Sequence, residues 1–80
     1  MASSHHVDMV IGELRAALPL DGHPLDESTV LRSLPDADSV NLLRVAARLE
    51  RQVDAEFDDE HLFGAETVGD LAGLLDAAES

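Results

Sequence analysis

The stretch Asp38-Ser39-Val40 is the part of this sequence best placed to do chemistry, because it puts a serine hydroxyl at the predicted start of an amphipathic helix, after a long polar loop. Taken alone, Ser39 would cap that helix by accepting a hydrogen bond from a backbone N–H. Nucleophilic catalysis would need a base within hydrogen-bond reach, and no histidine lies near Ser39 in sequence, although a distant one could fold close. A chain of 80 residues with two Phe and no other aromatic residue has little material for a substrate pocket, so we do not expect an enzyme acting alone.

Metal binding is not expected either. No two histidines have the i, i+4 spacing that places two imidazoles on one helix face, and we expect all four to be exposed to solvent: His5, His6, His23 and His61. Asp54, Glu56 and Asp58 have the alternate spacing of calcium-loop ligands. However, Asp59 stands where such a loop needs glycine, and Ala65 stands where it needs a bidentate glutamate.

The charge of the chain limits its partners. Seventeen acidic residues against five arginines give a formal charge of -12, which would repel nucleic acids and anionic lipids. The same charge either attracts basic patches on other proteins or only keeps a small domain soluble, and both interpretations remain open. Without cysteine, any thiol chemistry must come from an added group. We find no signal peptide at the start and no apolar run long enough to span a membrane, so a cytoplasmic location and no membrane partner are expected.

The first part of the chain is predicted to be a helix followed by an unusually long loop. Apolar residues recur on one helix face between Ser4 and Leu18, namely Val7, Val10, Ile11, Leu14 and Leu18. Proline, glycine and aspartate then interrupt the pattern up to Asp38. We expect four apolar side chains to anchor this loop in the core: Leu25, Val30, Leu31 and Leu34.

The second helix is predicted to run from Ser39 to Val53. Its core face contains Leu42, Val45, Ala46, Leu49 and Val53. The opposite face contains Val40, Leu43, Arg44, Ala47, Arg48 and Arg51. Exposed apolar residues bordered by charge suggest a surface that docks a partner protein. Alternatively, the apolar residues on this face are single exposed side chains of the ordinary kind.

The rest of the chain is predicted to hold a short helix and a final longer one. An acidic loop over residues 54–60 should turn Phe57 inward, and Asp59 to Gly64 should form one short helix ended by the glycine. Thr67 with Asp70 resembles a capping box before an apolar stripe of Val68, Leu71, Leu74 and Leu75. Gly69 and Gly73 should each weaken this helix by about 1 kcal/mol relative to alanine. The prediction is one all-α domain over residues 1–80, a small four-helix bundle of three main helices and one short one, with about residues 1–4 disordered.

The order of these features resembles the acyl and peptidyl carrier proteins over nearly the whole chain. The likeness consists of a first helix, a long anchored loop, Asp38-Ser39-Val40 at the start of the second helix, a short third helix, and Thr67-Val68-Gly69-Asp70-Leu71 opening the last. The three-residue motif is weak by itself. Its position near the middle of a chain of this size, with the second motif downstream, makes the likeness specific.

The resemblance implies that a phosphopantetheinyl transferase attaches 4′-phosphopantetheine from coenzyme A to Ser39, with Asp38 in a supporting role. The thiol of that arm would hold an acyl or aminoacyl group as a thioester. The protein itself would be non-catalytic and, we expect, monomeric. Loading, tailoring and condensing enzymes would dock on the second helix, where Val40 and Leu43 fall at the apolar positions of the docking surface, together with Arg44, Ala47, Arg48 and Arg51. A phosphodiester at a helix N-terminus is electrostatically favourable.

Two departures from the family pattern refine this expectation. Members usually have glycine two residues before the aspartate, where this chain has Asp36 within Pro35-Asp36-Ala37, and the approach to Asp38 appears one residue longer. The second helix of fatty-acid carriers is rich in acidic residues, whereas here its outer face carries three arginines. We therefore expect a stand-alone carrier of a specialised polyketide or nonribosomal peptide type of pathway. The alternatives are a primary fatty-acid acyl carrier and an unmodified helical adaptor that would not need Ser39.

Overall fold

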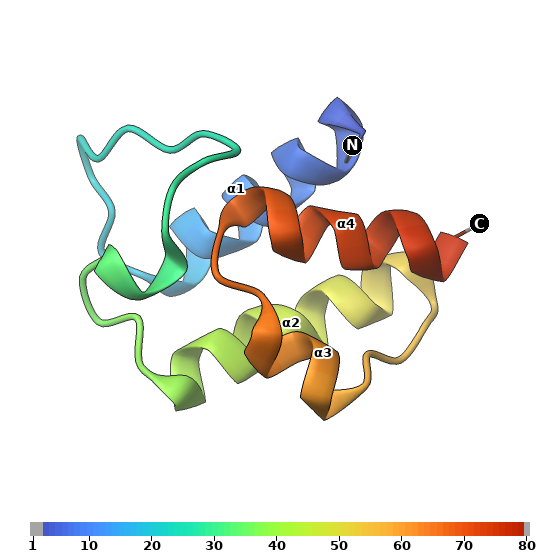
Figure 1. Ribbon diagram of the computed structural model, residues 1–80. Helices are drawn as coiled ribbons and strands as arrows, with labels where there is room; N and C mark the ends of the chain where they lie inside the picture. Colours follow the sequence, from blue (N-terminus) through green and yellow to red (C-terminus); the bar gives the residue numbers. More distant parts are fainter. Residues whose placement is uncertain (1–2, 80) are drawn as a thin grey trace.

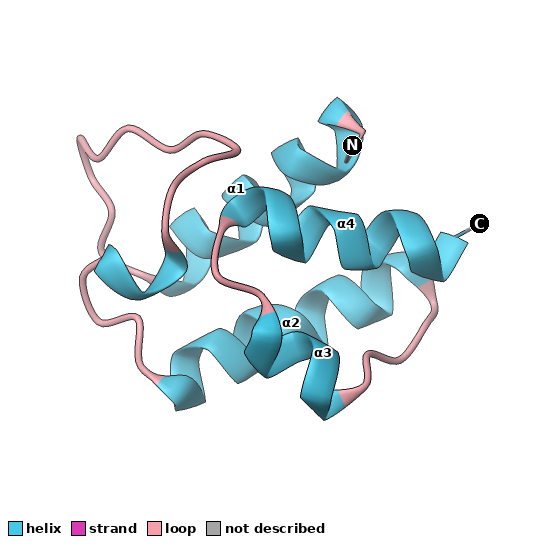
Figure 2. Cartoon of the chain, in the orientation of Figure 1, coloured by secondary structure: helices cyan, strands magenta, loops and turns pink. Residues whose placement is uncertain are grey.

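The structure is a computed structural model, which describes residues 3–79. Four α-helices form one layered bundle: α1 (Ser4–Ala17), α2 (Ser39–Val53), α3 (Asp59–Gly64) and α4 (Val68–Glu79). A single 3-10 turn, η1 (Leu31–Ser33), interrupts the long connection between α1 and α2. This arrangement confirms the predicted all-α carrier-type bundle, with the long loop at one end and both termini toward the other (Figures 1 and 2).

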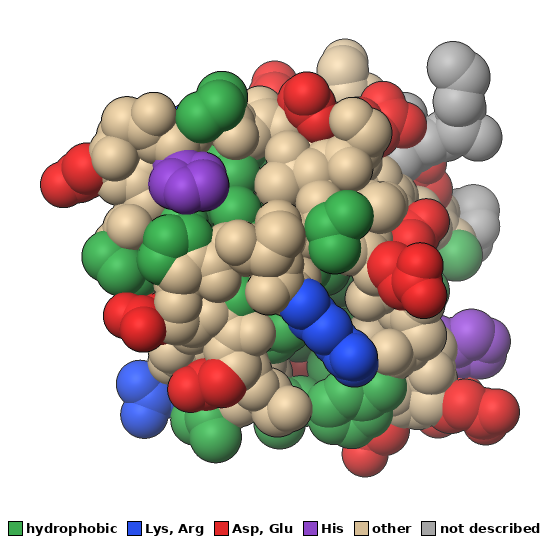
Figure 3. Space-filling model, turned by 60° about the vertical axis from the view of Figure 1, so that its left-hand side comes forward, with side chains coloured by type: hydrophobic (Ala, Val, Ile, Leu, Met, Phe, Trp, Pro, Cys, Tyr) green, Lys and Arg blue, Asp and Glu red, His purple; other side chains and the backbone are tan. Residues whose placement is uncertain are grey.

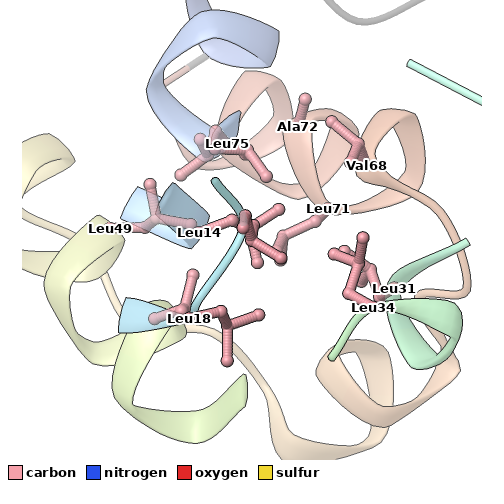
Figure 4. Close-up of a cluster of buried hydrophobic side chains, with 12 residues drawn as sticks. Leu14, Leu18, Leu31, Leu34, Leu49, Val68, Leu71, Ala72 and Leu75 are labelled. Atoms are coloured by element: carbon pink, nitrogen blue, oxygen red, sulfur yellow. The ribbon is translucent and has the colours of Figure 1, made fainter. Parts of the chain in front are cut away.

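Helix α1 packs against both α4 and α2, and the short α3 packs on α4. The core lies where these elements meet and is built from aliphatic side chains of every helix except α3, plus the long loop (Figure 4). Its buried members are Val10, Leu14, Leu18, Leu20, Leu31, Leu34, Val45, Leu49, Val68, Leu71, Ala72 and Leu75. Phe57 packs against this cluster from the acidic loop, which confirms that its ring points inward.

Local capping explains where the helices begin. Ser3 Oγ accepts the N–H of His6 at the start of α1. At α4, Thr67 Oγ1 accepts the N–H of Asp70, and Asp70 Oδ2 accepts the N–H of Thr67, so the predicted capping box is confirmed. Of the segment expected to be disordered, residues 1–2 lie outside the described part, whereas Ser3 is a cap and Ser4 is the first residue of α1.

The long loop is fixed by side chains and by backbone hydrogen bonds. Leu31 and Leu34 are buried as predicted, and Leu25 is half-buried against the core. Val30 is 48% exposed, so its predicted role as a core anchor is wrong. Its backbone instead forms an antiparallel bridge with Thr67, which turns the side chain outward.

Two further contacts of the loop were not predicted. Leu20, which follows α1 closely, is 2% exposed and takes an anchoring position in the core. Arg15 donates hydrogen bonds to the carbonyl oxygens of Leu20 and His23, over 3.4 and 3.1 Å.

Leu18 belongs to this loop rather than to the helix, because α1 ends at Ala17 and Leu18 adopts extended backbone angles as its cap.

Within residues 3–79 no helix is both long enough and apolar enough to cross a membrane.

Candidate functional site

The start of α2 is organised by Asp38 rather than by Ser39. Asp38 has extended backbone angles, and its Oδ1 accepts the N–H of Asn41 at 2.8 Å, while its carbonyl oxygen accepts the N–H of Leu42. Asp38 is therefore the N-cap, and the interpretation of Ser39 as the cap is wrong. Ser39 is the first residue of the helix, with an exposed side chain that no capping bond occupies.

The turn before Asp38 is built around Asp36. Asp36 has a φ of 59°, in the left-handed region that glycine adopts without a steric penalty. Its carbonyl oxygen accepts hydrogen bonds from the side-chain amide of Asn41 at 2.8 Å and from the N–H of Asp38 at 2.9 Å. Aspartate is among the few non-glycine residues that adopt this conformation, so it is compatible with the turn before Asp38.

A pocket with a volume of about 400 Å³ lies beside Ser39. It is formed by η1, the start of α2, α3, the connection to α4 and α4 itself, and we call it the Ser39 pocket. Its lining residues are Leu31, Arg32, Ala37, Asp38, Ser39, Leu42, Leu43, Leu62, Phe63, Ala65 and Leu71. Figure 3 shows a hollow with hydrophobic walls and one basic side chain lying across it. The volume lies within the range of small-molecule sites, roughly 300–1,000 Å³.

The surroundings of Ser39 fit a covalently attached phosphodiester. The hydroxyl is exposed at the first turn of a helix of 15 residues, where the backbone dipole favours an anion. Within the described residues, the N–H groups of Ser39 and Val40 have no protein acceptor, whereas those of Asp38 and Asn41 do. An added phosphate oxygen would therefore meet backbone donors rather than displace a bond that the fold needs.

The outer face of α2 is exposed along its whole length, and we call it the docking face. Its residues are Val40, Leu43, Arg44, Ala47, Arg48 and Arg51, all of which are exposed. Val40 is 60% exposed and Leu43 is 40% exposed, with Leu43 also lining the Ser39 pocket. The sequence placed these residues correctly on the solvent side. Their role in binding a partner stays a prediction.

Sequence reasoning missed two residues at this site. Phe63 of α3 is 50% exposed and lines the Ser39 pocket beside Leu43. Arg32 of η1 lines the same pocket from the long loop. A six-residue helix and a three-residue turn are too short for periodicity to show which side chains face outward, so no sequence signal could have found either residue.

One histidine departs from the expected exposure. His6 is 5% exposed, and its Nδ1 pairs with Asp76 Oδ1 across the bundle, so the prediction that all four histidines face solvent is wrong for His6. Asp76 Oδ2 also accepts the N–H of Ser3 at 2.9 Å. Asp76 of α4 therefore contacts the start of α1 through both of its carboxylate oxygens. The hydrogen bond from His6 holds the pKa of Asp76 below its ordinary value. The other three histidines are exposed.

The acidic loop after α2 does not assemble a metal centre. Asp54, Glu56 and Asp58 are all exposed, and residues 3–79 contain no group of three or more potential ligands. Asp54 takes a left-handed conformation with a φ of 53° and ends α2 as its C-cap. Glu50 Oε2 accepts the N–H of Phe57 at 2.7 Å, which holds the loop against the end of the helix.

Comparison with known proteins agrees with this geometry. The family model described as "Phosphopantetheine attachment site" matches residues 9–75, from within α1 to near the end of α4. No curated protein and no solved structure gave a significant match. The matched region contains the start of α2, the Ser39 pocket and the docking face. The chain belongs to the phosphopantetheine-attachment family of carrier domains, whose prosthetic group is covalently bound 4′-phosphopantetheine.

Proposed function

We propose that Ser39 carries the 4′-phosphopantetheine arm and that this chain presents an acyl or aminoacyl thioester to partner enzymes. The observation that carries the proposal is the exposed Ser39 hydroxyl at the first position of α2, directly after the capping Asp38. Two other serines have hydroxyls that are already engaged in hydrogen bonds. Ser28 Oγ donates to Asp26 Oδ1, and Ser33 Oγ donates to the carbonyl oxygen of Val30.

Attachment needs only a free hydroxyl from this chain. Ser39 Oγ would bond to the phosphorus of the phosphopantetheine group, the bond from that phosphorus to the adenosine bisphosphate part of coenzyme A would break, and the hydroxyl proton would pass to the transferase. The bound group supplies a thiol, which a chain without cysteine lacks. The chain itself contributes the anion-favouring helix start and the docking face, and it performs no catalysis.

We further infer a specialised pathway of the polyketide or nonribosomal peptide type. Arg44, Arg48 and Arg51 give the docking face a positive border, although the chain as a whole is strongly acidic. A partner surface complementary to this face would carry acidic groups, whereas a partner adapted to an acidic second helix would carry basic ones. The test compares loading rates. An amino-acid-activating enzyme or an acyltransferase of such a pathway should load the modified chain faster than a fatty-acid synthase acyltransferase does.

Intact mass spectrometry tests the attachment. The protein is incubated with coenzyme A and a broad-specificity phosphopantetheinyl transferase, and one added phosphopantetheine mass is expected. Ser39→Ala should gain none, while the matched control Ser33→Ala should be modified like the wild type. Modification that persists in Ser39→Ala would show that another residue carries the arm. No modification of the wild type would favour the helical adaptor, which needs no arm.

A further inference from the structure

Arg32 stands out among the cations of this chain by its position. It lines the Ser39 pocket together with Ser39 itself, and its side chain is exposed. Within residues 3–79 no carboxylate pairs with Arg32, whereas Arg48 lies 3.9 Å from a carboxylate oxygen of Glu13 and Arg15 is held by two backbone carbonyls. The guanidinium of Arg32 is therefore available to a ligand at the pocket rim.

Attachment of the arm changes the charge at this rim. A neutral hydroxyl becomes a phosphodiester with one negative charge, next to the carboxylate of Asp38, on a chain that already has a formal charge of -12. Asp38 keeps its Oδ1 on the N–H of Asn41, so it does not leave the site. Two adjacent anions repel each other unless a cation or several backbone donors offset them. Among the described residues that line the pocket, Arg32 is the only cationic one.

The chemistry of arginine suits this task. Its planar guanidinium presents a fork of N–H donors that matches two phosphate oxygens at once, and such charge-assisted bonds are stronger than neutral ones. Because Arg32 and Ser39 line one pocket, a phosphodiester held between them would lie at its rim. The rest of the arm would then have the apolar side chains of Leu43 and Phe63, which line the same pocket, within its path.

We infer that Arg32 is a positioning residue that binds the phosphodiester of the Ser39-linked arm and holds the arm over the Ser39 pocket. This inference rests on the proposed attachment at Ser39. It adds that the arm of the modified protein has a preferred place on the chain, at the junction of η1, α2 and α3, before any partner enzyme binds.

The test compares modified proteins in which one arginine has been changed. Wild type, Arg32→Gln, Arg32→Lys and the matched control Arg51→Gln are each converted with coenzyme A and the transferase, and their mass confirms the arm. Arg51→Gln removes the same charge from the far end of α2, away from the pocket. The readouts are the phosphorus-31 resonance of the phosphodiester, the proton resonances of Leu43 and Phe63, and the Tm before and after modification.

In Arg32→Gln we expect the phosphorus resonance to move toward that of free phosphopantetheine and the shifts of Leu43 and Phe63 on modification to shrink. The Tm of the modified form should fall by about 2–6 °C relative to Arg51→Gln, as for one exposed charge pair in a small domain. Arg32→Lys should recover part of each effect. Equal resonances and equal Tm values in modified Arg32→Gln and Arg51→Gln would overturn the role of Arg32 and leave the attachment at Ser39 intact. A wild type that gains no mass would overturn both the attachment at Ser39 and this inference.

Discussion

The backbone N–H of Gly69 donates a hydrogen bond to the carbonyl oxygen of Glu27 over 2.8 Å, so the first turn of α4 touches the long loop directly. A Cβ at position 69 would lie 2.7 Å from Glu27 Cγ and 3.0 Å from the Glu27 carbonyl oxygen. The N–H of Val68 donates to the carbonyl oxygen of Thr29 in the same way. The loop thereby accepts two of the N–H groups that a helix start leaves unpaired. Gly69 is required by this contact, although it lowers the helix propensity of α4.

Gly69→Ala should lower the free energy of unfolding by about 1–3 kcal/mol, because the new methyl group would force Glu27 and the loop away from α4. Gly73→Ala is the matched control in the same helix, since a Cβ there would meet no atom within 4 Å apart from its chain neighbours and the backbone of its own helix. That control should raise stability by up to about 1 kcal/mol through helix propensity. Urea denaturation measures both. Equal stabilisation by the two substitutions would mean that the loop does not press on α4 in solution.

Asp36→Gly should be tolerated within about 1 kcal/mol. Glycine relieves the left-handed backbone but costs entropy in the unfolded chain, and these effects oppose each other. Asp36→Val should destabilise the domain by about 1–2 kcal/mol, because a β-branched residue resists a positive φ. Thermal unfolding measures both variants. A valine variant as stable as the glycine variant would show that the turn before Asp38 does not need this conformation.

Asp38→Ala and Ser39→Ala should separate capping from attachment in the unmodified protein. Removing the N-cap carboxylate should cost about 1 kcal/mol, whereas removing the Ser39 hydroxyl should change stability by less than about 0.5 kcal/mol, because Ser39 makes no capping bond. Urea denaturation with helical circular dichroism measures both. An equal loss in the two variants would return the capping role to Ser39.

The pH dependence should show two regimes. Hydrogen bonds hold the pKa of three carboxyl groups below the ordinary value of 3.8: His6 acts on Asp76, Ser28 acts on Asp26, and the N–H of Glu66 acts on Asp70. A carboxyl group with a lowered folded pKa contributes its full stability above its unfolded pKa, and that stability is lost as the pH falls through the folded pKa. The contribution of these three groups to folding stability is therefore constant between pH 7 and 5, and it is lost only below about pH 4.

Between pH 7 and 5, acidification makes this strongly acidic chain less negative, and added salt screens its charges. Both changes reduce the repulsion within the folded chain, so Tm should rise in each case. Asp76→Asn should lower Tm near neutrality and make the loss below pH 4 less steep, because one of the three groups is gone. Calorimetric scans across this pH range measure both effects. A Tm that does not change with salt concentration and falls steadily from pH 7 to 5 would show that most carboxylates are paired.

Much of the fold could be predicted from the sequence because its signals are local. Helix α2 begins at Ser39 and ends at Val53 as expected, because its apolar stripe lies within the segment. Helix α3 spans Asp59–Gly64 as expected, because the glycine marks its end. The capping box of α4 needed only Thr67 and Asp70, three residues apart. Each of these features depends on neighbours that the sequence itself places together.

Features that depend on distant partners could not be predicted in this way. His6 is buried because Asp76, 70 residues later, meets it across the bundle. Val30 is exposed because its backbone pairs with Thr67, which lies far away in the sequence. Leu20 is buried in a core to which distant helices contribute. The Ser39 pocket combines Arg32, Leu43 and Phe63 from three elements, and no spacing in the sequence joins them. At the start of α2, Asp38 and Ser39 are equally good caps by type, and only the backbone geometry distinguishes them.

The docking face gives the last prediction, for which the structure selects the variants. Arg48 lies 3.9 Å from Glu13 Oε2 of α1, so a glutamate at position 48 would face another carboxylate and affect folding as well as binding. Arg44 has no such neighbour among the described residues and borders Val40 and Leu43. Arg44→Gln is therefore the cleaner change, and Ala78→Glu near the end of α4 is its matched control, because each substitution makes the net charge more negative by one.

Arg44→Gln should leave folding nearly unchanged and slow loading by the cognate enzyme, with the defect in association rate and strongest at low ionic strength, because charges at the rim of an interface steer encounter. Ala78→Glu should leave loading unchanged, which separates the local charge from the total. Leu43→Ala should weaken binding to the same degree at all salt concentrations, through lost apolar contact at the centre of the face. Stopped-flow binding and loading assays at two ionic strengths measure these effects. If Arg44→Gln and Leu43→Ala both load like the wild type, α2 is not the docking surface, and the long loop that approaches Asp38 becomes the better candidate.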